Sequence, residues 1–478
     1  KQVQEFLRIA NRTFAGNCDG LGWSHVAQTD ALGRLLPGHV DRDYVYLHTY
    51  PSATLGVRPE ARQALKTQIN DGVAILNFVG HGSPFKMTDE SVFIDSDAGT
   101  LANGLMMPLV ITASCDVGKF NDPTVQSLGE RLVTTAGNGA IAVISATDEA
   151  FSGQNSQLNQ NIFRRLFQRD TLQIGQAGGD VLPGIGQYHL AISSALLAAK
   201  LDGASSETNN SKYGLMGDAA TRLNLPRLWA DVALYDETGA PITQVQRGQT
   251  VTFRGQVLDS PGGTGLPFEG VASVLIEDSA PLDVTPPACG SSSYTTTFLY
   301  TAGPLYHGDV SVSNGVFEGR FVAAMDATLG TREGGRAYLQ GRSGADAFDS
   351  DGAGSVPFEL VNGAAPTTDT QGPRITLAFA GGATAVRPDA TLQINLFDES
   401  GIMTTGHALQ NAIVVTLDDN TTSRTDVSES FRYAADSYQS GVASYVLPGL
   451  AVGHHRIKVT AADNLASGFS AAQHRSSA

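Results

Sequence analysis

Apolar runs of strand length alternate with helix-period segments from the start of the chain to about Pro226. Short buried strands that alternate with amphipathic helices are typical of a parallel sheet covered on both faces, so this pattern predicts a mainly parallel α/β domain over residues 1–226. The predicted strands are 5–10, 44–48, 74–80, 109–114, 140–145 and 212–216. The predicted helices are 25–36, 59–70, 125–135, 157–168 and 188–201.

After Pro226 the pattern changes to an alternation of apolar and polar residues with a period of two. Residues 251–257 alternate in this way, and Gly and Pro residues such as those in 261–265 mark a turn. Because the side chains of a strand point alternately to its two faces, this alternation predicts half-buried strands joined by short turns. Residues 227–362 are therefore predicted to form a β-sandwich domain.

The remaining C-terminal part shows the same period-two alternation in a different sequence. Residues 363–371 are polar, contain Pro366 and several Thr, and are predicted to be a linker. Beyond them, alternating apolar residues at 392–396 and 455–459 predict a second sandwich over residues 372–478, of about immunoglobulin size. The predicted architecture is thus an α/β domain followed by two immunoglobulin-like β-sandwich domains.

Length and charge limit the function classes. A chain of 478 residues exceeds what one hydrophobic core usually organises, which agrees with several domains. The formal net charge of -16 argues against a nucleic-acid partner, because such a partner requires a basic surface to neutralise its phosphates. Only 16% of the residues are charged and 53 are Gly, a composition that favours a secreted, β-rich protein.

The cysteine count and the first residues add further expectations. With Cys18, Cys115 and Cys289 alone, the chain has neither a disulfide framework nor a zinc site built from several thiolates. No apolar run reaches the length of a transmembrane helix. The segment that begins at Lys1 does not resemble a signal peptide, so the start of the chain is expected to be a maturation product or a chosen boundary.

Two predicted strands of the α/β domain run into residues that can carry chemistry. The strand at 74–79 leads into Gly80-His81-Gly82-Ser83, and the strand at 109–113 leads into Ser114-Cys115-Asp116. The carboxyl ends of parallel strands form the ligand-binding edge of an open α/β sheet, so both side chains are expected at the same edge. A thiol is nucleophilic as a thiolate, and a nearby imidazole can accept its proton and later protonate a leaving amine.

An oxyanion intermediate would need hydrogen-bond donors at the same place. The backbone N–H groups of Gly82 and Cys115 are the natural candidates, because a glycine leaves its amide unobstructed. Taken singly, a cysteine after a buried strand is more often a small core residue, and a histidine in a glycine turn is commonly only a turn residue. Together, at the ends of successive strands, they indicate nucleophilic catalysis.

Several motifs of the α/β domain resemble the gingipain-type cysteine peptidases. Asn-Phe-Val-Gly-His-Gly-Ser at 77–83 resembles the histidine motif of that family, and Thr-Ala-Ser-Cys-Asp-Val-Gly-Lys-Phe at 112–120 resembles its nucleophile strand and following turn. The stretches 128–145 and 213–218 resemble the following helix and strand and the end of the last strand. The resemblance implies a caspase-like fold and an endopeptidase with Cys115 as nucleophile and His81 as its proton-transfer partner.

Within this family, Phe-Asn-Asp-Pro at 120–123 and Ala-Ala-Asp-Asn at 461–464 resemble the PorU-like sortases of the type IX secretion system. That resemblance implies a protein substrate, cut near the C-terminal secretion domain of a cargo protein, and transfer of the acyl group to an amine. It also implies an outer-membrane partner protein and a place outside the cell, secreted or on the extracellular face of the bacterial outer membrane.

The resemblance assigns three more residues. The family's third catalytic acid is expected just after the first strand, where residues 11–15 hold no carboxylate and Asp19 is the nearest substitute. His25 corresponds to the acidic specificity residue of arginine-specific gingipains, and Phe151 corresponds to an aromatic wall of the substrate pocket. A surface or core phenylalanine is the alternative interpretation of Phe151, and a tryptophan usual in the family is replaced around Met87.

No cofactor is required by this chemistry, although the resemblance is compatible with bound calcium. Asp346, Asp349 and Asp351 supply oxygen ligands at short spacing, but a solvated acidic loop explains them equally well. Metal binding by His454 and His455 is not expected. Two alternative functions remain: a catalytically impaired pseudo-peptidase that serves as a surface structural or adhesion module, and a carbohydrate-binding sandwich protein.

Overall fold

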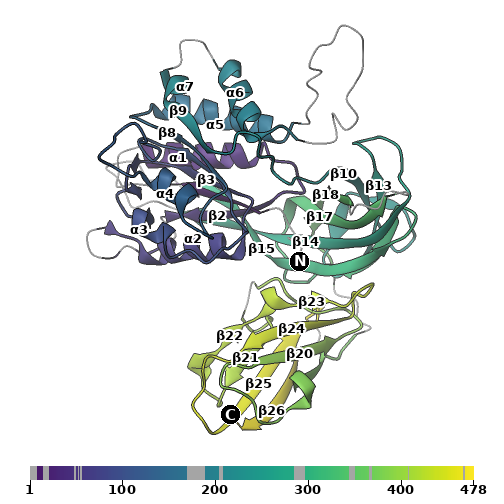
Figure 1. Cartoon of the computed structure of the whole chain (residues 1–478). Helices are drawn as coiled ribbons and strands as arrows, with labels where there is room; N and C mark the ends of the chain where they lie inside the picture. The colour runs from purple at the N-terminus through teal and green to yellow at the C-terminus, as the bar shows by residue number, and fades with distance from the viewer. Residues whose placement is uncertain are drawn as a thin grey trace, which may run out of the picture. The chain divides into compact units, whose positions relative to one another are not determined.

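The computed structural model describes residues 8–13, 21–47, 50, 51, 53, 56–168, 189–203, 208–284, 296–343, 350–364, 369–406, 409–466 and 469–477. The chain divides into two compact units (Figure 1): Lys1–Leu225 with Leu282–Phe298, and Pro226–Pro281 with Leu299–Ala478. In the described part of the chain, no helix has the length and apolar character needed to cross a membrane. The predicted four-part division, at 226, 362 and 371, stays a prediction.

The first unit is built on a six-stranded sheet with the order β2-β1-β3-β7-β8-β9. Its strands are β1 (Arg8–Thr13), β2 (Asp41–Tyr46), β3 (Ile75–Val79), β7 (Leu109–Ala113), β8 (Ala142–Ala146) and β9 (Tyr213–Gly217). Neighbouring strands are parallel from β2 to β8, and β9 runs antiparallel to β8. This confirms the predicted mainly parallel sheet, and each predicted strand is found within a few residues.

Helices cover both faces of this sheet (Figure 1). They are α1 (Leu21–Gly33), α2 (Pro59–Asp71), α3 (Asp95–Ala98), α4 (Leu128–Thr134), α5 (Ser152–Leu166), α6 (Ile192–Asp202) and α7 (Thr208–Lys212). Leu76 and Phe78 of β3 share one apolar core with residues of α2 and α4. Strand side chains alternate between faces, so Asn77 points to the opposite face, where α1 contacts β3 and α5 contacts β7.

The segment after β3 forms a small sheet that the periodicity did not predict. Its strands are β4 (Gly82–Ser83), β5 (Lys86–Met87) and β6 (Phe93–Ile94), paired in the order β4-β5-β6. Two-residue strands are too short to show a period of two, which is why the pattern missed them. The helices α3 and α7 were also missed, because four or five residues are too few to show the period of a helix. Met87 is fully buried in this small sheet.

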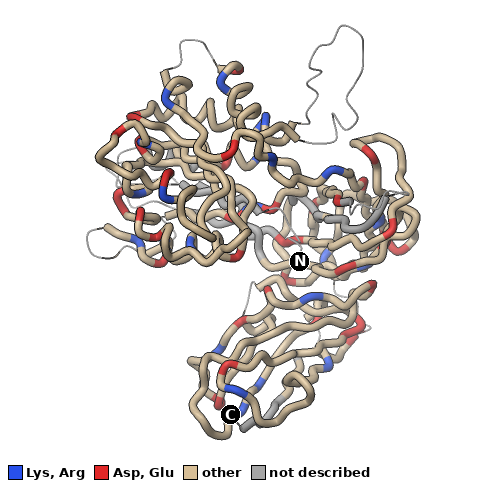
Figure 2. The backbone as a smooth tube through the Cα atoms, viewed as in Figure 1, with Lys and Arg blue, Asp and Glu red and all other residues tan. Residues whose placement is uncertain are grey.

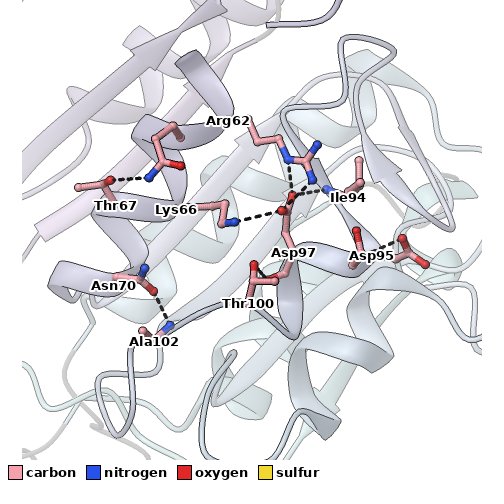
Figure 3. Close-up of polar contacts among 11 residues, drawn as sticks. Arg62, Lys66, Thr67, Asn70, Ile94, Asp95, Asp97, Thr100 and Ala102 are labelled. Carbon is pink, nitrogen blue, oxygen red and sulfur yellow. Dashed lines mark hydrogen bonds and ion pairs between the residues drawn. The ribbon is translucent and has the colours of Figure 1, made fainter. Parts of the chain in front are cut away.

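A polar network anchors the far end of this small sheet (Figure 3). The guanidinium of Arg62, on α2, donates two hydrogen bonds of 2.8 Å to the carboxylate of Asp97, and Lys66 Nζ lies 3.3 Å from the same group. The backbone N–H of Ile94 donates to Asp97 Oδ2 at 3.0 Å and so ties β6 to the start of α3. The segment that follows His81 is therefore held at both of its ends, by β3 and by this network.

From residue 226 onward the described chain consists of strands and short 3₁₀ turns. The strands are β10 (Leu228–Tyr235), β11 (Pro241–Ile242), β12 (Gln244–Gln246), β13 (Thr250–Leu258), β14 (Phe268–Val284), β15 (Thr296–Val312), β16 (Val316–Val322), β17 (Gly330–Ser343), β18 (Ser350–Val361), β19 (Arg374–Phe379), β20 (Thr391–Phe397), β21 (Val414–Leu417), β22 (Thr425–Asp426), β23 (Arg432–Tyr433), β24 (Ser440–Val446), β25 (His454–Ala462) and β26 (Phe469–Ser477). The turns are η3 (Ala380–Gly382), η4 (Thr421–Ser423) and η5 (Ser428–Ser430).

These strands form one 13-stranded sheet and one four-stranded sheet, β22-β21-β25-β26. The larger sheet contains strands from both predicted sandwiches, which meet where Gly308 of β15 pairs with Tyr433 of β23. Next to this pair the rings of Tyr306 and Tyr433 stack with centroids 5.0 Å apart. One continuous apolar core therefore serves both predicted sandwiches. The β-rich character is confirmed, and the immunoglobulin-like classification stays a prediction.

Charged residues are dispersed along the described chain. Figure 2 shows Lys and Arg interspersed with Asp and Glu in both units. The net charge of -16 is thus spread over many elements and is not confined to one of them.

Candidate active site

The register between β3 and β7 sets the positions of His81 and Cys115. Val79, the last residue of β3, pairs with Ala113, the last residue of β7, and Gly80 N–H donates to the Ala113 carbonyl at 3.4 Å. His81 and Cys115 each lie two residues beyond this pair, on adjacent parallel strands. The structure therefore brings both predicted residues to the carboxyl edge of the sheet, at the same level.

The loops that carry the two residues are in direct contact. A Cβ atom built on Gly82 would lie 2.6 Å from the Cys115 carbonyl oxygen and 2.8 Å from Ser114 Oγ. No side chain fits between backbones at that distance, so glycine at position 82 is what allows the histidine loop to lie on the cysteine turn.

The turn after Cys115 is fixed by its own backbone and by the end of β8. Asp116 has a left-handed backbone with φ of 56°, which is uncommon for a residue other than glycine. Its N–H donates to the Asp148 carbonyl at 3.4 Å, and Gly118 N–H donates to the Ala146 carbonyl at 3.0 Å. Lys119 Nζ lies 2.9 Å from Asp116 Oδ1 and spans the turn. Cys115 is thus held on a sharp bend at the end of a buried strand.

The sulfur of Cys115 is a free, half-buried thiol. The backbone N–H of Ala150 donates to Sγ at 3.2 Å, and the Ala150 carbonyl oxygen lies 3.6 Å from Sγ. The thiol is therefore not packed inside an apolar layer: it sits against a polar backbone segment at the edge of the sheet. An arrangement of this kind suits a reactive cysteine better than a structural one.

His81 is exposed, and its ring meets that of His25. The two ring centroids are 5.8 Å apart with an interplanar angle of 82°, an edge-to-face contact. His25 lies on α1 and is buried, with its Nε2 3.5 Å from Ser152 Oγ. Gln28 Nε2 donates to the same hydroxyl at 3.3 Å. The structure thus places His25, the predicted pocket residue, beside the predicted catalytic histidine.

Aromatic side chains are exposed in the loops that surround this edge. Phe151, at the start of α5, is 61% exposed, and Lys212 Nζ lies 5.5 Å from the centroid of its ring. Phe85 is 48% exposed and Phe120 is 56% exposed, in the loops after His81 and Cys115. Exposed aromatic side chains in loops that follow the strand ends of this sheet are available to contact a substrate. The sequence analysis named Phe151 as a pocket residue but did not name Phe85 or Phe120 as residues that can contact a substrate.

Some predicted residues fall outside the described part of the chain. Asp19, the substitute for the third acid, lies there, as do Asp346 and Asp349 of the suggested calcium loop. Asp351 is described, and its carboxylate lies 3.6 Å from Arg227 Nε. Among the described residues, no group of three or more His, Cys, Asp or Glu is placed to hold a metal ion.

The contacts of His455 give this residue a structural role in the β-rich part of the chain. Its Nδ1 lies 2.8 Å from Asp418 Oδ2, and its Nε2 lies 2.8 Å from the Ala451 carbonyl oxygen. The hydrogen bond with Asp418 raises the pKa of His455, with a further contribution from the Ala451 carbonyl. Both ring nitrogens are thus engaged by the protein.

Sequence reasoning missed a set of buried polar residues behind the cysteine turn. Asn155, Asn209 and Tyr213 are all buried and are linked by hydrogen bonds. The sequence offered no clear signal, because Asn155 precedes the predicted helix at 157–168 and so lay outside its apolar face. Its partners come from distant positions in the chain, which no local pattern could show.

Comparisons with known proteins found one family model and several solved structures that resemble parts of this chain. The model of peptidase family C25 matches residues 6–224. Among solved structures, dimeric latent PorU from Porphyromonas gingivalis matches with a TM-score of 0.34 and 20% identity, covering 60% of this chain and 28% of that one. The Arg-specific cysteine proteinase gingipain R matches with a TM-score of 0.35 and 14% identity, covering 75% and 68%.

A complex of the pro- and mature domains of RgpB from Porphyromonas gingivalis matches with a TM-score of 0.35 and 13% identity, covering 74% of this chain and 68% of that one. The chain thus spans 28% of the PorU chain that it matches. A search of curated protein sequences found no match.

Proposed function

We propose that this protein is a cysteine endopeptidase with Cys115 as nucleophile and His81 as its proton-transfer partner. The proposal starts from the premise that residues 6–224 belong to peptidase family C25, whose model they match. The observation that carries the proposal is the contact between the two loops. His81 and Cys115 lie at matching ends of adjacent parallel strands, and Gly82 packs on the Cys115 turn. A caspase-like domain followed by two immunoglobulin-like sandwiches is the architecture that we assign to the chain.

The proposed reaction follows from the chemistry of the two side chains. The imidazole of His81 takes the thiol proton, and the thiolate of Cys115 attacks the carbonyl carbon of the scissile peptide bond. The amide C–N bond then breaks, the leaving amine takes the proton from the imidazolium, and a thioester remains on Cys115. Water or an acceptor amine attacks the thioester, releases the acyl group and restores the thiol.

The oxyanion that forms in each half-reaction needs donors at the same edge. We assign this role to the backbone N–H groups of Gly82 and Cys115, because both belong to the loops that meet there. His25 and Phe151 are assigned to the substrate pocket, one beside the His81 ring and the other exposed next to Ala150. Asp19 is the proposed third acid.

The finer function that we propose is cleavage of secreted cargo proteins near their C-termini, as in the type IX secretion sortases. The motifs at 120–123 and 461–464 support this choice. The proposal includes a place outside the cell, either secreted or at the extracellular face of the bacterial outer membrane, and an outer-membrane partner protein. Calcium is not required by the proposed chemistry.

Alkylation of the thiol tests the proposal directly. The full chain is incubated with iodoacetamide over a range of pH, and the adduct is mapped to the peptide that contains Cys115. We expect fast labelling of Cys115 that the His81→Ala variant loses. Labelling no faster than that of a free cysteine peptide would contradict the proposed pair.

A catalytically impaired pseudo-peptidase is the second candidate function. It is favoured by residues 11–15, which contain no carboxylate where the family places its third acid. Processing of a cargo protein distinguishes the two candidates, since a peptidase needs its nucleophile. Equal processing by the wild type and by Cys115→Ala would support the pseudo-peptidase, and loss of processing in that variant would support the enzyme.

A further inference from the structure

The Cys115 sulfur accepts a hydrogen bond from the backbone N–H of Ala150. Residues outside the cysteine turn fix the position of this N–H. Ala150 N–H is the donor found at 3.2 Å from Sγ, and Ala150 lies in the segment that joins β8 to α5. A hydrogen bond to a charged acceptor is stronger than one to a neutral acceptor, so this N–H is placed to bind the thiolate that the proposed reaction requires. The bond requires that residues 147–151 keep one conformation.

Asn209 imposes that conformation on the residue next to Ala150. Asn209 is 0% exposed, its Nδ2 donates to the Phe151 carbonyl at 2.8 Å, and its Oδ1 accepts from Phe151 N–H at 3.0 Å. The side-chain amide thus pairs with both backbone groups of Phe151, as a neighbouring strand would. Lys212 supports the same segment, because its carbonyl accepts from Thr147 N–H at 3.0 Å and its Nζ donates to the Glu149 carbonyl.

Tyr213 connects this brace to the cysteine turn. Its hydroxyl lies 2.7 Å from Asn155 Oδ1, which also accepts from Asn209 Nδ2 at 2.7 Å. The same hydroxyl lies 3.3 Å from the carbonyl oxygen of Ser114, the residue before the nucleophile. Burial first, and then the electrostatic interaction with Cys115, raise the pKa of Tyr213. The phenol therefore stays protonated, and its one proton is shared between Asn155 Oδ1, the nearer acceptor, and the Ser114 carbonyl oxygen.

We propose that Asn209 and Tyr213, joined through Asn155, are positioning residues: they fix the Ala150 amide at the Cys115 sulfur and the backbone of the cysteine turn at Ser114, and so keep this N–H in place for the thiolate. This role rests on the proposed function of Cys115. Neither residue touches the reacting atoms: each acts through a backbone group that it fixes. The brace joins α5, α7, β9 and the nucleophile turn, so it defines the thiol environment from the side opposite to the His81 loop.

The test compares the pH profile of Cys115 alkylation by iodoacetamide in the full-length wild type, Asn209→Ala and Tyr213→Phe. Tyr213→Phe keeps the buried ring and removes only the hydroxyl. We expect both profiles to move to higher pH by about one unit, because a lost hydrogen bond to a charged acceptor weakens the charged form by roughly that much. A brace that only stabilised the fold would lower the melting temperature and leave the profile in place.

Asn210→Ala is the matched control. Asn210 is the neighbouring residue on α7, and its Nδ2 donates to the Lys200 carbonyl at 3.0 Å, away from Cys115. Its profile is expected to follow that of the wild type. If Asn209→Ala does not fold, judged by circular dichroism, Tyr213→Phe decides alone.

Two outcomes overturn the inference, and they are distinguishable. If the wild type reacts fast and depends on His81 while both variants reproduce its pH profile, the positioning role is wrong and the proposed function stands. If the wild type reacts no faster than a free cysteine peptide, the proposed function fails and the positioning role fails with it.

Discussion

Gly82 shows how much a single residue contributes to this site. It follows the candidate histidine as the first residue of β4 in the small sheet, and its missing side chain leaves room for the Cys115 carbonyl. His81 can be near Cys115 only if these two backbones touch. At the residue scale, the candidate site therefore depends on a glycine as much as on the two side chains that we propose as catalytic.

Replacing this glycine gives a direct prediction. In Gly82→Ala the new Cβ would meet the Cys115 carbonyl oxygen at 2.6 Å, so one loop must move. We expect Cys115 alkylation to lose its dependence on His81 and the free energy of unfolding to fall by about 1–3 kcal/mol. Gly153→Ala is the control, since its Cβ meets nothing within 4 Å, and it is expected to retain full reactivity. A Gly82→Ala protein in which alkylation of Cys115 is as fast as in the wild type and still depends on His81 would contradict the importance of this contact.

Asp398 is a second residue with a measurable consequence, in the second unit. Burial, followed by the charges of Asp369 and Asp463, raises the pKa of Asp398 from its ordinary value of 3.8 to about 7. The folded protein then holds this proton more tightly than the unfolded chain does. The resulting stabilisation is fully present below about pH 4 and is lost as the pH rises to about 7.

The Asp398→Asn variant removes that charge at every pH. Its amide can still accept from Ser400 N–H, which donates to Asp398 Oδ1 at 2.8 Å. We expect it to gain stability over the wild type at pH 8 and to gain little at pH 4, measured by urea unfolding of the full chain. The exposed Asp389→Asn serves as control and should show no such pH-dependent difference. A gain of the same size at both pH values would contradict the interpretation.

At the scale of elements, the register of β3 and β7 and the anchoring of the loop between them decide where the chemistry lies. Both strands are fully buried and parallel, so their ends coincide at one edge of the sheet. Without an anchor at its far end, the segment after His81 would be a long loop held only by β3. The Asp97 network of Figure 3 ties its far end to α2.

Asp97→Ala tests that anchor. Burial alone would raise the pKa of Asp97, but hydrogen bonds from Arg62 and from Ile94 N–H and the charge of Arg62 hold the pKa below its usual value. Removing one partner of such a buried pair leaves the other uncompensated, so we expect a loss of about 3 kcal/mol in urea unfolding. Asp89→Ala, an exposed partner of Lys86, should cost less than about 1 kcal/mol. Equal losses in the two variants would exclude the anchoring role.

At the scale of the whole molecule, the C-terminal half is organised around one core. Residues of both predicted sandwiches belong to the same apolar cluster, and the Tyr306 and Tyr433 rings stack within it. The predicted linker at 363–371 therefore joins two parts that share buried surface. Independent folding of residues 227–362 is not expected from this packing.

A pair of fragments tests this. Residues 226–362 produced alone should expose the apolar side chains that the later strands cover, and should bind a hydrophobic dye such as ANS. Residues 226–478 should unfold cooperatively and bind little dye. Cooperative unfolding of the shorter fragment without dye binding would show that the two sandwiches are independent.

The sequence by itself determined the alternating α/β pattern, the change to strands after Pro226 and the placement of His81 and Cys115 at one edge of the sheet. These follow from local periodicity and from the rule that parallel strands end at one edge. It also placed His25 and Phe151 near the site through resemblance. The small sheet β4-β5-β6 escaped, because two residues carry no period.

Only the tertiary structure decided what surrounds the sulfur. Ala150 lies in one distant segment, and Asn209 and Tyr213 lie together in another, and nothing in their local sequence marks them as neighbours of the cysteine turn. The same holds for the core that the two predicted sandwiches share. Local patterns report which face of an element is buried, whereas the partners of a buried polar group depend on how the elements pack.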